Sequence, residues 1–82
     1  MELRSILGER IRRRRRELGK TQAELADETG IPIQVLSRLE GGHQSIYVER
    51  LAALAAALSV SADYLLGLKD KMESERLTAV PA

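Results

Sequence analysis

The chain has 82 residues, no cysteine, tryptophan or phenylalanine, and a formal net charge of +1. This length predicts one small domain with a single core, and the lack of cysteine excludes disulfide bonds and thiolate metal sites. Since nothing resembles a signal peptide or a run of about 20 apolar residues, we expect a cytoplasmic protein without a membrane span.

The charges are unevenly distributed along the chain. Residues 1–20 hold eight Lys or Arg and three Glu, a net charge of +5. Residues 21–82 hold five Lys or Arg and nine Asp or Glu, a net charge of −4. Most of the positive charge is the run Arg12 to Arg16 in the first predicted helix. Because a helix turns 100° per residue, five consecutive arginines point all round its axis and cannot all face one anionic surface.

Arg15 is predicted to lie on the apolar face of this helix. Ile11, Arg15 and Leu18 stand at positions i, i+4 and i+7, so they form one stripe. A buried arginine requires an anionic partner, and Glu40 is the candidate. We therefore assign Arg15 and Glu40 a structural ion pair, the alternative for Arg15 being direct contact with DNA.

The other arginines of this helix are candidates for attracting phosphate groups: Arg10, Arg12, Arg13, Arg14 and Arg16. The alternative is a solvated helix face, in which Glu9 and Arg13 form a favourable pair at positions i and i+4. We expect at least two of these arginines to have no further role.

The segment Thr21 to Glu40 is the most informative part of the sequence. Thr21 and Glu24 predict a capping box at the start of a helix, and Gly30 can adopt the left-handed conformation that ends it. A second helix follows at once, with Pro32 in its first turn. Its apolar residues recur at helical spacing: Ile31, Val35, Leu36 and Leu39. Two short helices joined in this way form a helix-turn-helix, the layout of many DNA-reading motifs.

The opposite face of the second helix carries a stripe of exposed side chains at positions i, i+1, i+4 and i+5: Ile33, Gln34, Ser37 and Arg38. An amide suits adenine, a guanidinium suits guanine or a phosphate, and an apolar side chain can contact a thymine methyl group. The stripe is therefore predicted to read base edges. The alternatives are an ordinary solvated face and, for Ser37, a packing role.

These features resemble the lambda-repressor-like family of small bacterial and phage regulators, also called the Xre or Cro type. The resemblance covers roughly residues 7–67 and implies an all-α, compact five-helix domain that binds double-stranded DNA as a homodimer. It also points to the pair of Arg15 and Glu40. The matching residues are Gly8, Ile11, Arg15, Thr21, Gln22, Leu25, Ala26, Gly30, Ser37, Glu40, Gly42, Leu51, Ala55, Leu58, Val60, Tyr64, Leu65 and Leu66.

Several polar residues are predicted to contact the DNA backbone. Thr21 and Gln22 stand at the amino end of the motif's first helix, where the helix dipole favours phosphate. Arg12 is assigned to the same role. In the family, the loop after the motif flanks the backbone, and here Gly42 supplies a tight turn in it. The side chains of this loop that we assign to phosphate are His43, Gln44 and Ser45.

The loop is less basic than the family often has it, so we expect weaker anchoring here. His43 is the only histidine, and no cysteine or second histidine completes a metal or catalytic site. We therefore predict no metal and no cofactor.

The carboxyl-terminal part predicts two more helices. One runs from Tyr47 to Leu58, with Ser59 where the family often has glycine or asparagine, so mild strain is expected at that turn. Its apolar stripe comprises Val48, Leu51, Ala55 and Leu58. Ser61 is a natural N-cap for a short fifth helix at about 62–66.

The run YLLGL holds more apolar surface than one short helix buries in its own domain. We predict that Tyr64, Leu66 and Leu68 contact a second subunit, the alternative being that the leucines close the core. A symmetric dimer predicts a palindromic operator with half-sites about 34 Å apart. The DNA-binding domain is expected to comprise residues 1–67, and residues 68–82 to form an extension that joins the dimer contact or a frayed tail.

The predicted function is that of a sequence-specific transcriptional regulator, a repressor that occupies an operator. The alternative is a protein-binding module of the same fold, such as an antitoxin or an antagonist of another regulator, which the weakly basic loop and the apolar carboxyl end favour. We predict no enzymatic activity, because no paired carboxylates, phosphate loop or nucleophile with a base can be assembled from these residues.

Overall fold

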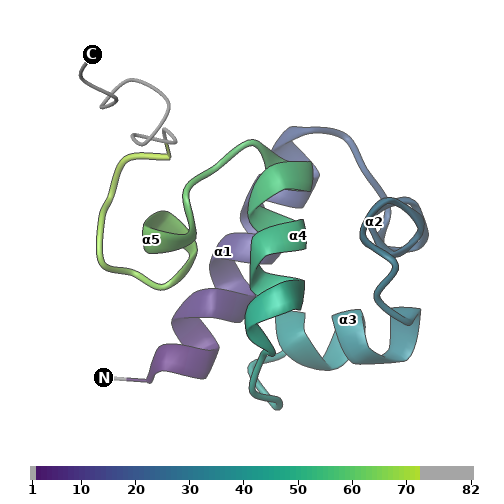
Figure 1. Ribbon diagram of the computed structural model, residues 1–82, viewed down its shortest axis with the longest axis horizontal. Helices are drawn as coiled ribbons and strands as arrows, with labels where there is room; N and C mark the ends of the chain where they lie inside the picture. The colour runs from purple at the N-terminus through teal and green to yellow at the C-terminus, as the bar shows by residue number, and fades with distance from the viewer. Residues whose placement is uncertain (1, 73–82) are drawn as a thin grey trace.

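The computed structural model describes residues 2–72, which form five helices and no strand. The helices are α1 (Leu3–Glu17), α2 (Gln22–Thr29), α3 (Ile33–Glu40), α4 (Val48–Leu58) and α5 (Ala62–Leu65). In Figure 1, α4 stands in the middle with α1 behind it, α3 runs across the lower end, and α2 and α5 lie on opposite sides. The predicted all-α, five-helix fold is confirmed. The part of the predicted extension after residue 72 lies outside the described residues.

A single apolar core joins the five helices. The largest fully buried side chains come from every helix: Ile11, Leu25, Leu36, Leu39, Leu54, Leu58, Tyr64 and Leu65. Helix α1 lies close against α3 at Gly8, where a Cβ atom would overlap the backbone carbonyl groups of Leu39 and Glu40. Glycine at this position therefore lets α1 support the carboxyl-terminal end of α3.

Two predicted apolar stripes differ from the observed ones. Leu18 is 37% exposed because α1 ends at Glu17, which leaves Leu18 outside the helix. Val48 is 77% exposed as the first residue of α4, and Leu54, which the predicted stripe omits, is fully buried instead. The buried face of α4 is therefore centred on Leu54 and Leu58 rather than on the start of the helix.

The predicted start and end of α2 are present. The backbone N–H of Glu24 donates to the Thr21 hydroxyl at 3.1 Å, and the Glu24 carboxylate accepts from the Thr21 backbone N–H at 2.8 Å. The hydrogen bond from the Thr21 backbone N–H to the Glu24 carboxylate is the main cause that lowers the pKa of Glu24 below its ordinary value, and hydrogen bonding with the Thr21 side chain is the second cause. Gly30 ends the helix with φ of 73°, and the chain then passes directly to α3.

Two arginines of α1 fasten the carboxyl-terminal helices. Arg14 Nε donates to the carbonyl of Leu58 at 2.9 Å, and Arg10 donates to the carbonyls of Tyr64 at 2.9 Å and Lys69 at 2.8 Å. Arg10 also lies 4.5 Å from the centroid of the Tyr64 ring. Cations at the carboxyl ends of helices bind carbonyls that have no partner within the helix. Arg10 and Arg14 were both candidates for attracting phosphate, and the structure assigns them to packing instead.

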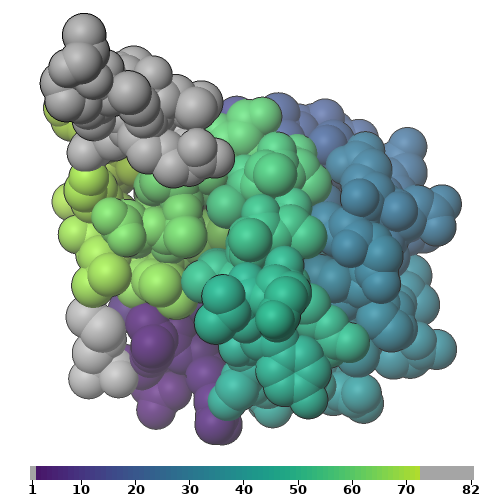
Figure 2. Space-filling model, in the orientation of Figure 1, coloured from purple at the N-terminus to yellow at the C-terminus, as the bar shows by residue number. Residues whose placement is uncertain are grey.

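The chain after α5 turns back along the domain. The backbone N–H of Ser61 donates to the carbonyl of Met72 at 2.8 Å, and the Met72 side chain packs against the core. Residues 68–72 of the predicted extension therefore lie on the domain. Figure 2 shows this yellow-green segment at the left of the molecule, above the purple amino end of α1 in this view.

Candidate nucleic-acid interface

The two faces of α3 have opposite character. Leu36, Leu39 and Glu40 are buried against the rest of the domain. The four residues of the predicted stripe are all exposed, with Ile33 41% exposed, and they comprise Ile33, Gln34, Ser37 and Arg38. The structure thus brings an apolar group, an amide, a hydroxyl and a guanidinium together on one outward face. We call these four side chains the exposed stripe.

A buried ion pair holds the carboxyl end of α3. Arg15 Nε donates to Glu40 Oε2 at 2.7 Å, and Arg15 Nη2 donates to Oε1 at 3.0 Å. The exposed fractions of the two residues are 8% and 4%. The hydrogen bonds to Glu40 raise the pKa of Arg15 above its ordinary value. Arg15 Nη1 also donates to the carbonyl of Lys20, so the pair that the sequence predicts is present and is bonded to the turn before α2.

Gln22 is connected to this pair. Its amide nitrogen donates to Glu40 Oε1 at 3.1 Å, a bond that spacing along the chain does not indicate. An amide nitrogen carries two hydrogens, so one remains for an acceptor beyond the domain. Thr21 is exposed, but the carboxylate of Glu24 already binds its backbone N–H, which leaves the hydroxyl hydrogen.

The loop after α3 folds back on the end of that helix. The N–H groups of Gly41, Gly42 and His43 donate to the carbonyls of Ser37, Leu39 and Arg38 at 3.0, 3.1 and 3.0 Å. Gly42 has φ of 78°, and a Cβ atom there would lie 3.2 Å from the Cα of Ser5. Glycine therefore lets the loop turn tightly against α1.

The three polar side chains assigned to this loop differ in their surroundings. His43 and Ser45 are exposed. Gln44 is half-buried, and its amide oxygen accepts a hydrogen bond from Arg38 Nε at 3.0 Å. This contact between the loop and the exposed stripe was missed in the sequence.

The remaining arginines of α1 lie on its outer side. Arg12 is half-buried and lines a shallow groove, and the residues of that groove are Glu9, Arg12, Arg13, Arg16 and Glu17. Arg13 pairs with Glu9 at 2.8 Å, the arrangement expected of a solvated face. These arginines are accessible, but acidic side chains of the same helix are interspersed among them.

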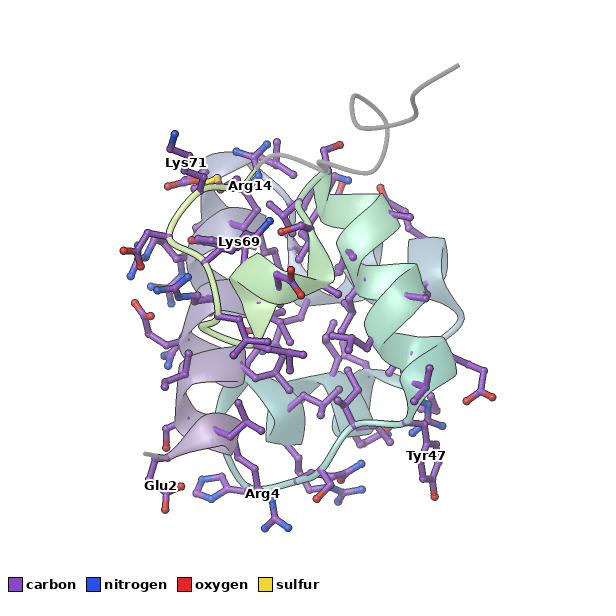
Figure 3. The ribbon with its side chains drawn as sticks, turned by 60° about the vertical axis from the view of Figure 1, so that its left-hand side comes forward. Glu2, Arg4, Arg14, Tyr47, Lys69 and Lys71 are labelled. Atoms are coloured by element: carbon purple, nitrogen blue, oxygen red, sulfur yellow. The ribbon has the colours of Figure 1, made fainter. Side chains whose placement is uncertain are left out.

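Two residues beside α3 were not identified from the sequence. Figure 3 shows the side chains of Arg4 and Tyr47 extending outward at the edge of the molecule where α3 lies, whereas Arg14, Lys69 and Lys71 lie at the opposite end. Tyr47 is 68% exposed, and the guanidinium of Arg50 lies 5.1 Å from its ring centroid. The available signal was Tyr47, an aromatic residue that stands directly before α4 and is not needed for the packing of that helix.

The three residues assigned to a dimer contact do not share one environment. Tyr64 is 2% exposed and packs under Arg10, so the prediction that it contacts a second subunit is wrong, because its ring is used by its own core. Leu66 is half-buried, and Leu68 is 66% exposed. Next to them Gly67 lies against Ile6, so α1 and the end of α5 form one continuous surface.

Within residues 2–72, no cluster of three or more histidine or acidic side chains has the arrangement of a metal site. None of the helices in this part of the chain has the length and apolar character needed to cross a membrane.

Comparison with known proteins adds a consistent set of relatives. A family model described as helix-turn-helix matches residues 11–65. The transcriptional repressor RstR of the cryptic phage CTXphi in Vibrio cholerae is 36% identical over 69 residues, which are 84% of this chain and 62% of that protein. The chain therefore spans about three fifths of the length of this relative.

Two solved structures are similar in fold and sequence. The c2 repressor of Salmonella phage P22, in complex with a synthetic operator, has a TM-score of 0.71 and 42% identity over 73% of this chain and 91% of that one. A complex of the proteins SinR and SinI has a TM-score of 0.73 and 31% identity over 88% of this chain and 72% of that one.

Proposed function

The chain belongs to the lambda-repressor-like helix-turn-helix family of transcription regulators, and from this premise we propose that it is a sequence-specific repressor that binds operator DNA. The observation that carries the proposal is the exposed stripe on α3, because the opposite face of that helix is fixed by the core and by the buried pair of Arg15 and Glu40. A rigid helix with an outward polar face is what major-groove reading requires. Binding to the operator excludes polymerase. The proposal involves no catalytic step and no cofactor, and it places the protein in the cytoplasm.

The stripe supplies a different contact at each position. We assign Gln34 to an adenine, Arg38 to a guanine, and Ile33 to a thymine methyl group. Ile33 borders a shallow groove between α2 and α3, which gives the methyl group apolar surroundings. Ser37 is exposed between Gln34 and Arg38, where its hydroxyl can donate to or accept from a base edge.

Backbone anchoring is assigned to groups around the stripe. Gln22 has an unused amide hydrogen at the amino end of α2, and Thr21 has its hydroxyl hydrogen. Arg12, the loop at Gly42 and the exposed side chains of His43 and Ser45 complete this set.

We also propose that the protein binds as a homodimer. Leu68 is 66% exposed and Leu3 is 46% exposed, and the half-buried side chain of Ile6 lies against Gly67, which stands between Leu66 and Leu68 in the chain. Two copies that cover this surface form a symmetric pair that fits an inverted repeat. Since the solved relative SinR is found in complex with SinI, a different protein on this surface is the second candidate.

The proposal is tested by selecting bound sequences from a pool of random double-stranded DNA at near-physiological salt. We expect enrichment of an inverted repeat, with the protein sedimenting as a dimer. Arg38→Ala should change one base position in each half-site. The matched control is Lys71→Ala, which removes one positive charge at the end of the molecule away from α3, and it should leave the selected sequence unchanged.

Two outcomes would contradict the proposal. Salt-sensitive binding without any sequence preference would exclude specific reading, since phosphate contacts alone produce it. A monomer that selects a single asymmetric site would exclude the homodimer while leaving the DNA-reading role intact.

A further inference from the structure

The bond between Gln44 and Arg38 joins two residues that were assigned different roles. Arg38 belongs to the exposed stripe, whereas the sequence predicts that Gln44 contacts the DNA backbone. Their side chains are nevertheless bonded, with 3.0 Å between Arg38 Nε and the amide oxygen of Gln44. The five residues between them, 39–43, include the end of α3 and the whole tight turn.

The turn is built in a way that fixes this contact. His43 N–H donates to the carbonyl of Arg38 itself at 3.0 Å, so the backbone of the loop is tied to the residue that Gln44 contacts. A Cβ atom at Gly41 would lie 2.8 Å from the ring of His43, so the loop also packs on itself. Gln44 is half-buried within this arrangement, whereas Arg38 is exposed.

The bond uses a specific edge of the guanidinium group. Arg38 Nε is engaged, and among the described residues no hydrogen bond engages its two terminal nitrogens. Guanine presents two acceptors, O6 and N7, which an arginine binds with two parallel N–H groups. With Nε held by Gln44, the two terminal nitrogens remain for this contact, and an approach through Nε is blocked.

We propose that Gln44 is a positioning residue for Arg38, which sets the orientation in which Arg38 reads a base, and that it is not a contact of the DNA backbone. This inference rests on the proposed function. A long arginine side chain loses conformational freedom when it binds, and a bond formed before binding removes part of that loss. Gln44 therefore contributes to discrimination at the position that Arg38 contacts.

The test begins in the free protein. Nuclear magnetic resonance of the arginine Nε–H groups reports their exchange with water, and we expect slower exchange at Arg38 than in the variant Gln44→Ala. Equal exchange rates in the two proteins would overturn the inference, because the bond would then be absent in solution.

The second arm measures affinities for a panel of operators that differ from the selected half-site by one base pair each. We expect Gln44→Ala to reduce discrimination about 3- to 10-fold at the position that Arg38→Ala affects, the range for one hydrogen bond. Gln44→Ala should add no further loss at that position when Arg38 is already Ala. Gln44→Glu keeps the acceptor oxygen and should retain discrimination, and Lys71→Ala, at the end of the molecule away from α3, is the control that should leave discrimination unchanged.

The outcomes separate this inference from the proposed function. If Gln44→Ala weakens all operators equally and Gln44→Glu weakens them further by repelling phosphate, Gln44 contacts the backbone and the inference is overturned. If the wild-type protein binds every operator of the panel equally, the proposed function fails and the inference fails with it. Melting curves of each variant show that the comparison is made between folded proteins.

Discussion

Two groups of residues around α3 differ in burial. The difference separates the residues that support this helix from those that we propose read DNA. The inner group consists of Gly8, Arg15 and Glu40, which lie in a buried contact between α1 and the end of α3. The outer group is the exposed stripe together with the half-buried Gln44, which is joined to the stripe by its hydrogen bond with Arg38. Substitutions in the inner group should change stability, whereas those in the outer group should change base preference.

Gln22 lies at the boundary between these two groups. Its bond to Glu40 ties it to the inner group, while its position at the start of α2 places it beside the outer one. This arrangement couples a proposed phosphate contact to the buried pair. Correct placement of the backbone contact thus depends on the same carboxylate that stabilises the fold.

The largest effect is expected from breaking the buried pair on one side. Arg15→Met leaves the Glu40 carboxylate buried without its partner, which typically costs about 3–5 kcal/mol, a large share of the stability of a small domain. The double variant Arg15→Met/Glu40→Leu removes that unpaired charge and should melt at a higher temperature than Arg15→Met. Both lose the bond from Arg15 to the Lys20 carbonyl, and the double variant also loses the bond from Gln22 to Glu40. A higher melting temperature for the double variant would therefore arise from removing the unpaired carboxylate, in spite of that further loss. Equal melting temperatures would contradict the role of the pair.

The next effect is expected at Gly8. A methyl group there overlaps the carbonyl groups of Leu39 and Glu40, so Gly8→Ala should destabilise the domain by about 1–3 kcal/mol through overpacking. Helix propensity alone predicts the opposite sign, because alanine is the better helix former by about 1 kcal/mol. Thermal unfolding followed by circular dichroism decides between them, with Ala52→Ser as a control that adds one atom at an exposed helix position. A higher melting temperature for Gly8→Ala would show that α1 and α3 are not in close contact there.

A smaller effect is expected from Arg38 and Gln22, which test base contacts against contacts to the DNA backbone. Arg38→Ala should lose about 1–3 kcal/mol of discrimination at one position of each half-site and keep the wild-type melting temperature. Gln22→Ala should weaken all operators by a similar factor, with about 0.5–1.5 kcal/mol lost for its hydrogen bond to phosphate. Titration of both variants with operators that differ by one base pair measures these losses of discrimination and of affinity. Uniform weakening by both variants would refute the division between the two groups.

The features that sequence predicts best are those set by short spacing. The capping box at Thr21 and Glu24 needs only three residues, and the exposed stripe follows from the period of one helix. In both cases a local rule restricts the alternatives to very few. The partner of Arg15 lies 25 residues away, and it was identified because an arginine on an apolar face requires an anion and because the family resemblance points to Glu40.

The features that were missed depend on how distant segments meet. Arg10 and Arg14 lie on one side of α1, but the carbonyls that they bind belong to residues more than 40 positions later. The bond from Arg38 to Gln44 requires the path of a turn, which composition does not define. Tyr64 was assigned to a second subunit because counting apolar residues does not tell which of them faces inward.

The smallest effect is expected from the capping box, which fixes the first turn of α2 and with it Gln22. The hydrogen bonds from Thr21 lower the pKa of Glu24, so this carboxylate stabilises the fold above its ordinary pKa and loses that contribution as the pH falls through the lowered value. Glu24→Gln retains an acceptor for the Thr21 N–H but does not titrate. Wild type should therefore be more stable than Glu24→Gln at pH 7, and the two should converge at an acidic pH that lies below the lowered pKa of Glu24. Unfolding by urea at both pH values measures this difference, with Asp27→Asn as the control for losing one exposed carboxylate from the same helix. A difference between wild type and Glu24→Gln that is the same at both pH values would show that the charge of Glu24 does not stabilise the first turn of α2.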